Sequence, residues 1–224
     1  MSGFSFAALF DMDGVLVDNL NYHVQAWRTF AHHHGRTLTL EDYFRHVNGR
    51  VAADALPFVL GRDLSRDEIV AFTEEKEATY RQLYGPDLQP TPGLIPFLQT
   101  LKTSGTGLAV GTSAPFSNIG FTLDGLRIRS YFDAVVDASM ISRGKPDPEI
   151  YLQAAERLGV PPSRCVVFED AYSGIEAGLR AGMKVVALAT THTPGELAGC
   201  GAHHIIPNFE AGLERGLHRL DNWL

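Results

Sequence analysis

The chain has 224 residues, of which 45% are hydrophobic and 20% charged, and its net charge is −7 at pH 7. These values describe a globular protein that can bury a sizeable core, as one domain with an insertion or as two small domains. The acidic balance argues against a general nucleic-acid binder, and the N-terminal apolar run is too short for a signal or membrane helix. Because Cys165 and Cys200 show no spacing pattern, we interpret them as free thiols and expect a cytoplasmic protein.

The first predicted element is a short strand over residues 6–10. Its five apolar residues show no polar alternation, which is typical of a parallel strand buried on both faces. Asp11 and Asp13 follow it, and Gly14 opens a turn. Two acids so close together would repel each other and resist burial, and a bound cation is the simplest remedy. The ordinary alternative is a solvated turn.

The next stretch, residues 19–84, is predicted to be entirely helical. Apolar residues recur at spacings of three and four, and Ser65 with Glu68 forms a capping-box signature. The expected helices cover residues 20–34, 40–47, 52–60 and 65–84.

After the prolines at 86, 90 and 92, short β-rich runs alternate with helices. The expected strands are 107–110, 134–136, 165–168, 185–189 and 204–206, and the expected helices are 95–103, 116–123, 148–158, 174–181 and 213–220. This alternation predicts an α/β fold with a mostly parallel sheet and helices on both faces. Residues 1–16 and 89–224 then form the core domain, and residues 17–88 form an inserted all-α domain.

Polar residues follow three of the predicted strands. They are Asp11 and Asp13 after the first, Thr112 and Ser113 after the second, and Glu169 and Asp170 after the strand at 165–168. Because ligands of open parallel sheets bind at the carboxyl ends of the strands, we expect these groups at one edge, within reach of Lys145.

This combination suits phosphoryl transfer. Carboxylates supply the hard oxygen ligands that Mg²⁺ prefers, Thr112 can donate to a phosphoryl oxygen, and Lys145 can neutralise charge. One carboxylate could attack phosphorus while another moves protons. Each motif taken singly has an ordinary structural explanation, such as helix capping by Glu169 and Asp170. We reject the possibility that all of these ordinary explanations apply at once, because the motifs fall at successive strand ends.

The four motifs resemble those of the haloacid dehalogenase superfamily in order and spacing. They are FDMDGV (residues 10–15), GTS (111–113), KPDPEIY (145–151) and FEDAYSGIEAG (168–178). The resemblance implies a Rossmann-like core, and the helical insertion is similar to the small cap of the subfamily that includes β-phosphoglucomutase. It also implies Mg²⁺ as cofactor.

The resemblance assigns roles to the matched residues. Asp11 would be the nucleophile and a metal ligand, and Asp13 the general acid and base, with its backbone carbonyl on the metal. Thr112 and Lys145 would hold the phosphoryl group, while Asp170, and Glu169 directly or through water, would bind the metal. An acid at position 13 favours phosphate chemistry over dehalogenation.

Further residues are candidates for substrate binding. By resemblance, His23 assists acid–base positioning, and Asn48, Gly49 and Arg50 form the specificity loop of the cap. Lys76 could face the cleft, with a solvated lysine as the alternative. After Thr112, the family's mutases present lysine or asparagine to the sugar phosphate, where this chain has Ser113 and Ala114.

The expected function is therefore a Mg²⁺-dependent phosphatase of small sugar phosphates that forms an aspartyl-phosphate. The alternative is β-phosphoglucomutase, which interconverts β-glucose 1-phosphate and glucose 6-phosphate. That alternative is weakened because Asn48 and Ala52 stand where the mutases carry a lysine and an arginine. A non-catalytic binder of phosphorylated metabolites is a third hypothesis. We expect a monomer whose partner is a small phosphorylated metabolite, with no nucleic acid and no membrane.

Overall fold

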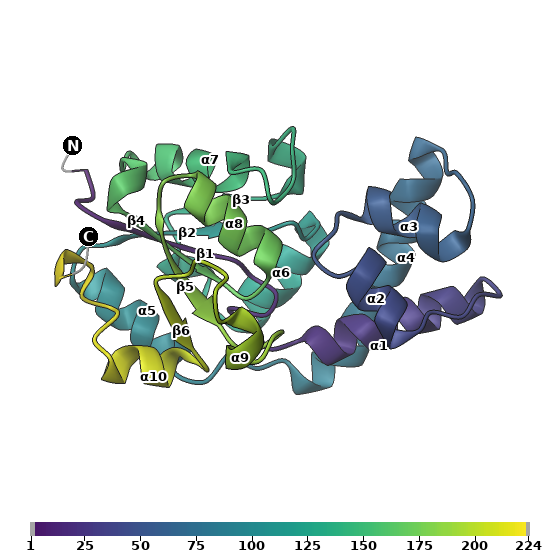
Figure 1. Cartoon of the computed structure of the whole chain (residues 1–224), viewed down its shortest axis with the longest axis horizontal. Coiled ribbons are helices and arrows are strands. Elements are labelled where there is room, and N and C mark those ends of the chain that lie inside the picture. Colours follow the sequence, from purple (N-terminus) through teal and green to yellow (C-terminus); the bar gives the residue numbers. More distant parts are fainter. Residues whose placement is uncertain (1–2, 223–224) are drawn as a thin grey trace. The chain divides into compact units, whose positions relative to one another are not determined.

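The computed structural model describes residues 3–222 and divides into two compact units. Unit 1 comprises residues 1–18 and 89–224, and unit 2 comprises residues 19–88. Both are drawn in Figure 1. No helix within residues 3–222 is both long and apolar enough to cross a membrane.

A parallel sheet of six strands, in the order β3-β2-β1-β4-β5-β6, organises unit 1. The strands are β1 (Ala7–Phe10), β2 (Gly107–Gly111), β3 (Ala134–Val136), β4 (Cys165–Glu169), β5 (Lys184–Leu188) and β6 (His204–Ile206). β1 lies between β2 and β4, and all four of its residues are buried. The predicted mostly parallel α/β fold is confirmed.

Helices cover both faces of this sheet (Figure 1). They are α5 (Leu94–Thr103), α6 (Phe116–Gly125), α7 (Glu149–Leu158), α8 (Tyr172–Arg180), α9 (Pro194–Leu197) and α10 (Phe209–Glu214). Short 3₁₀ turns lie at Arg129–Tyr131, Ala138–Met140, Pro162–Arg164 and Leu220–Asn222. Ala8 and Phe10 point into a core with α5, α6 and α10, whereas Ala7 and Leu9 point into a second core with α7 and α8. Alternate side chains of one strand thus serve two cores, which explains its unbroken apolar run.

In the C-terminal part, one expected helix is corrected and one helix was not predicted. The helix predicted over residues 213–220 is instead α10, because Asn208 caps it by accepting a hydrogen bond from the Ala211 amide at 3.0 Å. Gly216, with φ of 71°, lies beyond its end. The unpredicted helix α9 starts at a capping box of Thr193 and Glu196.

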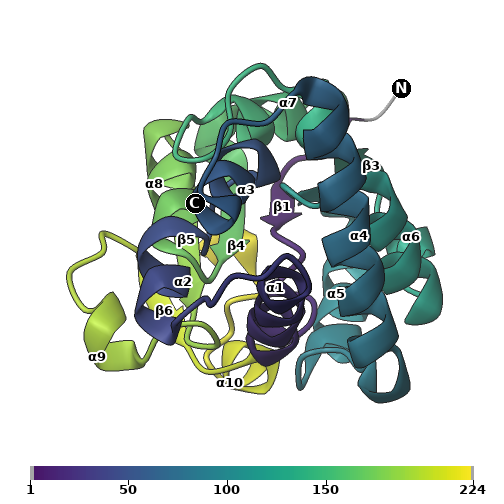
Figure 2. The same ribbon diagram turned by 90° about the vertical axis from the view of Figure 1, so that its right-hand side faces the viewer.

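Unit 2 consists of helices α1 (Leu20–His33), α2 (Leu40–His46), α3 (Ala52–Leu60) and α4 (Arg66–Tyr84), followed by a 3₁₀ turn at Gly85–Asp87 (Figures 1 and 2). Helix α4 packs against both α1 and α3. The core of unit 2 includes Trp27, Phe30, Tyr43 and Leu56.

Candidate active site

Three carboxylates meet where β1 and β4 end. The two strands pair in register, with Phe10 opposite Phe168, and the Asp11 amide donates to the Phe168 carbonyl at 3.0 Å. Asp11 leaves β1 beside Glu169, the last residue of β4, and Asp170 follows. One carboxylate oxygen from each of these acids lies within 4.8 Å of the others, and all three residues are buried.

Lys145 bridges two of these acids. Its Nζ lies 2.7 Å from Asp11 Oδ1 and 2.6 Å from Glu169 Oε1, and its side chain is 6% exposed. The loop that carries it is tied to the start of α7, because the Ser142 and Arg143 amides donate to the Glu149 carboxylate at 2.9 Å each. The structure therefore brings Lys145 to the sheet edge where the sequence predicted it.

The charges of this cluster are strongly coupled. Burial raises the pKa of Asp11 to about 7, with Lys145 opposing the shift and the Glu169 charge adding to it. Burial and the charges of Glu169 and Asp11 also hold the pKa of Asp170 well above its usual value. Burial lowers the pKa of Lys145, but the Asp11 and Glu169 carboxylates outweigh it and keep that pKa well above its usual value. Lys145 is thus a permanent cation among acids that repel one another.

Glu169 accepts hydrogen bonds at both of its carboxylate oxygens. Oε1 accepts from Lys145 and from the Tyr151 hydroxyl at 2.8 Å, and Oε2 accepts from the backbone amides of Asp170 at 2.9 Å and Ala171 at 3.1 Å. A Cβ atom on Gly174 would lie 1.6 Å from Oε1, so any larger residue there would displace the carboxylate from these hydrogen bonds. Tyr151 lies within the KPDPEIY motif, but the sequence reasoning assigned it no role.

Asp170 is held in a comparable way. Its Oδ2 accepts a hydrogen bond from the Thr191 hydroxyl. Gly14, at φ of 78°, leaves the space that the carboxylate occupies, because a Cβ there would lie 2.0 Å from Oδ2. The sequence reasoning missed Thr191. The signal was available, since Thr191 follows β5 at the same end of the sheet as the other site residues.

The remaining predicted residues of unit 1 lie at the ends of β1 and β2. Thr112 is buried, and its Oγ1 accepts from the Ala114 amide at 3.0 Å. Ser113 and Ala114 continue the turn after β2, with Ser113 partly exposed and Ala114 buried. Asp13 is partly exposed and forms a backbone bridge with Val17.

In unit 2, His23 and Lys76 are brought together. The Lys76 Nζ lies 3.5 Å from His23 Nδ1 and 5.1 Å from the Trp27 ring centroid, and it forms an ion pair with Glu77. The His23 ring stacks on Tyr80 at 4.0 Å. Lys76 is 3% exposed, so the alternative of a solvated lysine is wrong.

The candidate specificity loop lies elsewhere in the same unit. Asn48 Oδ1 accepts from the Tyr43 hydroxyl at 3.4 Å, and the exposed Arg50 donates to the Arg45 carbonyl at 3.4 Å. Gly49, at φ of 72°, forms the exposed turn between them.

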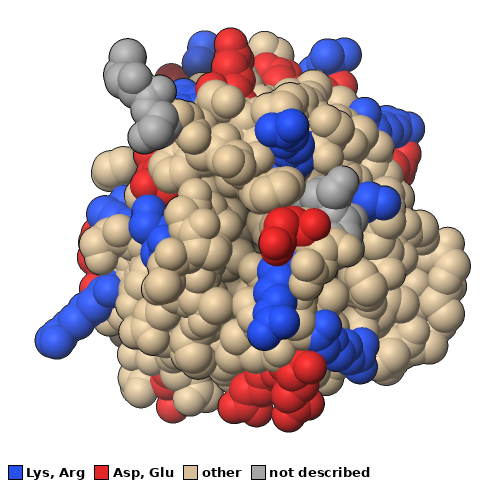
Figure 3. Space-filling model, turned by 90° about the vertical axis from the view of Figure 1, so that its left-hand side faces the viewer, with Lys and Arg blue, Asp and Glu red and all other residues tan. Residues whose placement is uncertain are grey.

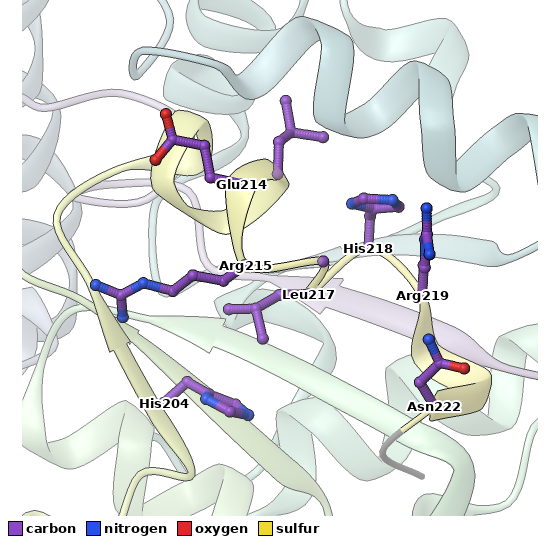
Figure 4. A pocket seen from close by; sticks show the side chains of 9 residues that line it. His204, Glu214, Arg215, Leu217, His218, Arg219 and Asn222 are labelled. Carbon is purple, nitrogen blue, oxygen red and sulfur yellow. The ribbon is translucent and has the colours of Figure 1, made fainter.

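A separate cavity of about 470 Å³ lies beside β6 (Figure 4). His204, Arg215, His218 and Arg219 contribute to its lining, together with Leu217. Burial lowers the pKa of both histidines, which favours neutral imidazoles. The cavity contains none of the predicted site residues. On the face shown in Figure 3, basic and acidic side chains are interspersed.

Known hydrolases share the sequence features that build this fold and this cluster of acids around Lys145. Residues 7–182 match the haloacid dehalogenase-like hydrolase family. The chain is 35% identical to the phosphorylated carbohydrates phosphatase of Thermotoga maritima over 178 residues, covering 80% of this chain and 82% of that protein. It is 36% identical to hexitol phosphatase A of Escherichia coli over 191 residues, covering 83% and 84% of the two chains.

Among solved structures, β-phosphoglucomutase from Clostridium difficile superposes with a TM-score of 0.83 at 27% identity, covering 98% of both chains. The chain belongs to the haloacid dehalogenase-like hydrolase family, and it is an enzyme of that family. The resemblance inferred from the four motifs is confirmed.

Proposed function

We propose that the protein is a Mg²⁺-dependent phosphatase of small sugar phosphates that acts through an aspartyl-phosphate on Asp11. The observation that carries this proposal is the Lys145 ammonium, held 2.7 Å from Asp11 and 2.6 Å from Glu169 in a buried acidic cluster. The relatives named above act on phosphorylated carbohydrates and hexitol phosphates, which supports the choice of substrate class.

The donor set fits a magnesium ion. Hard carboxylate oxygens within 4.8 Å of one another suit Mg²⁺, and buried acids with raised pKa values need more positive charge than one lysine supplies. We assign the ion to Asp11, Asp170 and the Asp13 carbonyl, with Glu169 binding directly or through water. When bound, Mg²⁺ would neutralise charge on the carboxylates and on the phosphoryl oxygens.

The protein's own groups would then carry the reaction. Asp11 attacks phosphorus, the bond to the leaving oxygen breaks, and Asp13 protonates that oxygen. Asp13 next takes a proton from a water molecule, which hydrolyses the aspartyl-phosphate to phosphate and free Asp11. Lys145 and Thr112 hold the phosphoryl oxygens, and Lys145 offsets their charge.

In unit 2, we propose that His23 assists acid–base positioning and that Lys76, Asn48, Gly49 and Arg50 help to bind and select the substrate. Ser113 and Ala114 would line the sugar side of the site. The roles of His23, Asn48 and Gly49 follow from the family resemblance, and the contact between Lys76 and His23 supports placing Lys76 with them.

A panel of phosphate esters assayed with Mg²⁺ tests the proposal. We expect free phosphate from small sugar phosphates, and a loss of at least 10³-fold in Asp11→Asn, which keeps the size of the side chain but removes the nucleophile. Asp124→Asn is the control, because Asp124 is an exposed partner of Arg129 outside the site. Full activity of Asp11→Asn would contradict the mechanism. An absence of turnover across the whole panel would favour the non-catalytic binder.

The second candidate is β-phosphoglucomutase, favoured by the structural likeness to that enzyme over 98% of both chains. Against it, Asn48 and Ala52 stand at the two positions where the mutases of the family carry cations that grip a second phosphate, although Arg50 lies between them. A coupled assay with β-glucose 1-phosphate and its bisphosphate activator separates the two. Glucose 6-phosphate forming faster than free phosphate would establish the mutase.

A further inference from the structure

Tyr151 is a buried aromatic residue in the first turn of α7, and its side chain reaches the candidate active site. The residue is 0% exposed. Its ring packs against the backbone of β2, where a Cβ on Gly111 would lie 3.2 Å from the ring. The Lys145 Nζ lies 5.1 Å from the ring centroid, within the range of a cation–π contact.

The Tyr151 hydroxyl and the Lys145 ammonium share one acceptor. Both donate to Glu169 Oε1, the hydroxyl at 2.8 Å and the ammonium at 2.6 Å. A phenol has an ordinary pKa of about 10 and keeps its proton at neutral pH, so the hydroxyl is the donor and the carboxylate oxygen the acceptor. A buried hydrogen bond to a carboxylate is among the stronger kinds in proteins.

The rest of the Glu169 carboxylate is already fixed by the backbone. Oε2 accepts from the Asp170 and Ala171 amides, and Gly174 lies against Oε1. The hydrogen bonds to Oε2 thus come from backbone amides, whereas those to Oε1 come from the side chains of Lys145 and Tyr151. If the Tyr151 hydroxyl is removed, Oε1 loses a neutral donor, and the Lys145 ammonium becomes its one remaining side-chain donor among the described hydrogen bonds.

We propose that Tyr151 is a positioning residue, whose hydroxyl fixes Glu169 Oε1 so that this oxygen and Asp11 together orient the Lys145 ammonium toward the phosphoryl group. This inference rests on the proposed function for the identity of that group. The competing explanation is that Tyr151 only fills space between α7 and β2. Tyr151→Phe distinguishes the two, because phenylalanine keeps the ring and its packing but lacks the hydroxyl.

The kinetic test compares Tyr151→Phe with Tyr131→Phe. The control removes a hydroxyl that accepts from Gln99 at 3.2 Å, away from the site. We expect kcat/KM of Tyr151→Phe to fall about tenfold, because an ill-placed ammonium holds the phosphoryl oxygens less well and matters most where charge moves in the transition state. Tyr131→Phe should stay within twofold of the wild type. Kinetics of Tyr151→Phe equal to those of the wild type would overturn the inference.

A binding measurement provides a readout that needs no turnover. Calorimetric titration of the Mg²⁺-loaded protein with inorganic phosphate should give a dissociation constant about fivefold higher for Tyr151→Phe, with Tyr131→Phe unchanged. In the Glu169→Gln background, adding Tyr151→Phe should change that constant less than twofold, because the hydroxyl acts through Glu169. Unchanged phosphate affinity in Tyr151→Phe, or no binding by the wild type, would refute the positioning role.

The two measurements also separate this inference from the proposed function. If the wild type released no phosphate from any ester but bound inorganic phosphate more tightly than Tyr151→Phe, the proposed function would fail and the positioning role would stand. If the wild type were an active phosphatase and Tyr151→Phe matched it in both measurements, the function would stand and the positioning role would fail.

Discussion

At the residue scale, two hydroxyl groups donate hydrogen bonds to the acids of the candidate site. The Thr191 hydroxyl donates to Asp170, as the Tyr151 hydroxyl donates to Glu169. Neither Thr191 nor Tyr151 acts as the nucleophile, acid or base in the proposed mechanism. Their common effect is to restrict the rotamers of carboxylates that would otherwise turn away from one another, since buried like charges repel.

Thr191→Val tests this restriction at Asp170. The substitution keeps the shape of the side chain but removes the donor, so the carboxylate is less well placed for the ion. We expect the Mg²⁺ concentration for half-maximal activity to rise about tenfold, at the low end of the range seen for partners of metal ligands. Thr103→Val, which removes a hydroxyl bonded to the Gln99 carbonyl on α5, is the control. A magnesium dependence identical to that of the wild type would count against a role for Thr191.

The two cysteines should differ sharply in reactivity. Burial raises the pKa of Cys165 to about 12, whereas Cys200 is partly exposed, and both are free. At pH 8 roughly one Cys165 in ten thousand is then a thiolate, the reactive form. Iodoacetamide followed by mass spectrometry should show one labelled cysteine in the native protein and two in denaturant. Rapid native labelling of Cys165 would disprove the prediction.

At the scale of elements, the start of α4 behaves as its local sequence predicts. The Ser65 hydroxyl accepts from the Glu68 amide at 3.3 Å, and Glu68 Oε2 accepts from the Ser65 amide at 2.9 Å. The same signature at Thr193 and Glu196 starts α9, which the sequence reasoning overlooked. A capping box can be recognised from four residues because its contacts are local.

Ser65→Ala should destabilise unit 2 by about 1 kcal/mol, the usual cost of losing an N-cap. Hydrogen bonds from Arg62 and Ser65 lower the pKa of Glu68 from 4.5 to about 2. A lowered pKa in the folded state means that this contribution is complete above pH 4.5 and is lost as the pH falls toward 2. Urea unfolding at pH 7 and pH 3 measures both effects. Thr103→Ala is the control, because it removes a hydroxyl within α5 and leaves every cap intact. An unchanged unfolding midpoint for Ser65→Ala would contradict the prediction.

At the scale of the whole molecule, the acidic cluster opposes folding unless a cation is bound. The pKa of Asp11 is raised from 3.8 to about 7, so the folded protein holds this proton more tightly than the unfolded chain. The metal-free protein should therefore lose stability as the pH rises from about 4 to 7. Added Mg²⁺ should restore stability most strongly above pH 7, where the carboxylates are ionised.

Thermal unfolding with EDTA or with Mg²⁺, at pH 6 and pH 8, measures this effect. The stabilisation by Mg²⁺ should be larger at pH 8, and Asp170→Asn should reduce it. A stabilisation that is equal at the two pH values, or unaffected by Asp170→Asn, would contradict the assignment of the site. The expectations of a cytoplasmic monomer with no nucleic-acid partner stay predictions.

Several features of this protein were determined by its sequence alone. Uninterrupted apolar runs marked the strands, spacings of three and four marked the helices, and acids after two strands marked the edge of the sheet where the acidic cluster lies. These signals are local, because side-chain periodicity and strand-end chemistry depend on neighbours in the chain. That is why Asp11, Lys145, Glu169 and Asp170 could be named before their contacts were seen.

Only the tertiary structure decided which strands are neighbours and which side chains support the acids. The order β3-β2-β1-β4-β5-β6 places β4 beside β1, and so Glu169 beside Asp11, although these acids are far apart in the chain. Tyr151 meets Glu169 across a separation of 18 residues, and Thr191 meets Asp170 across 21. Such contacts arise from packing of whole elements, which no local pattern encodes. The candidate reactive groups can therefore be named from sequence motifs, whereas the residues that contact and support them emerge only when the sheet is assembled.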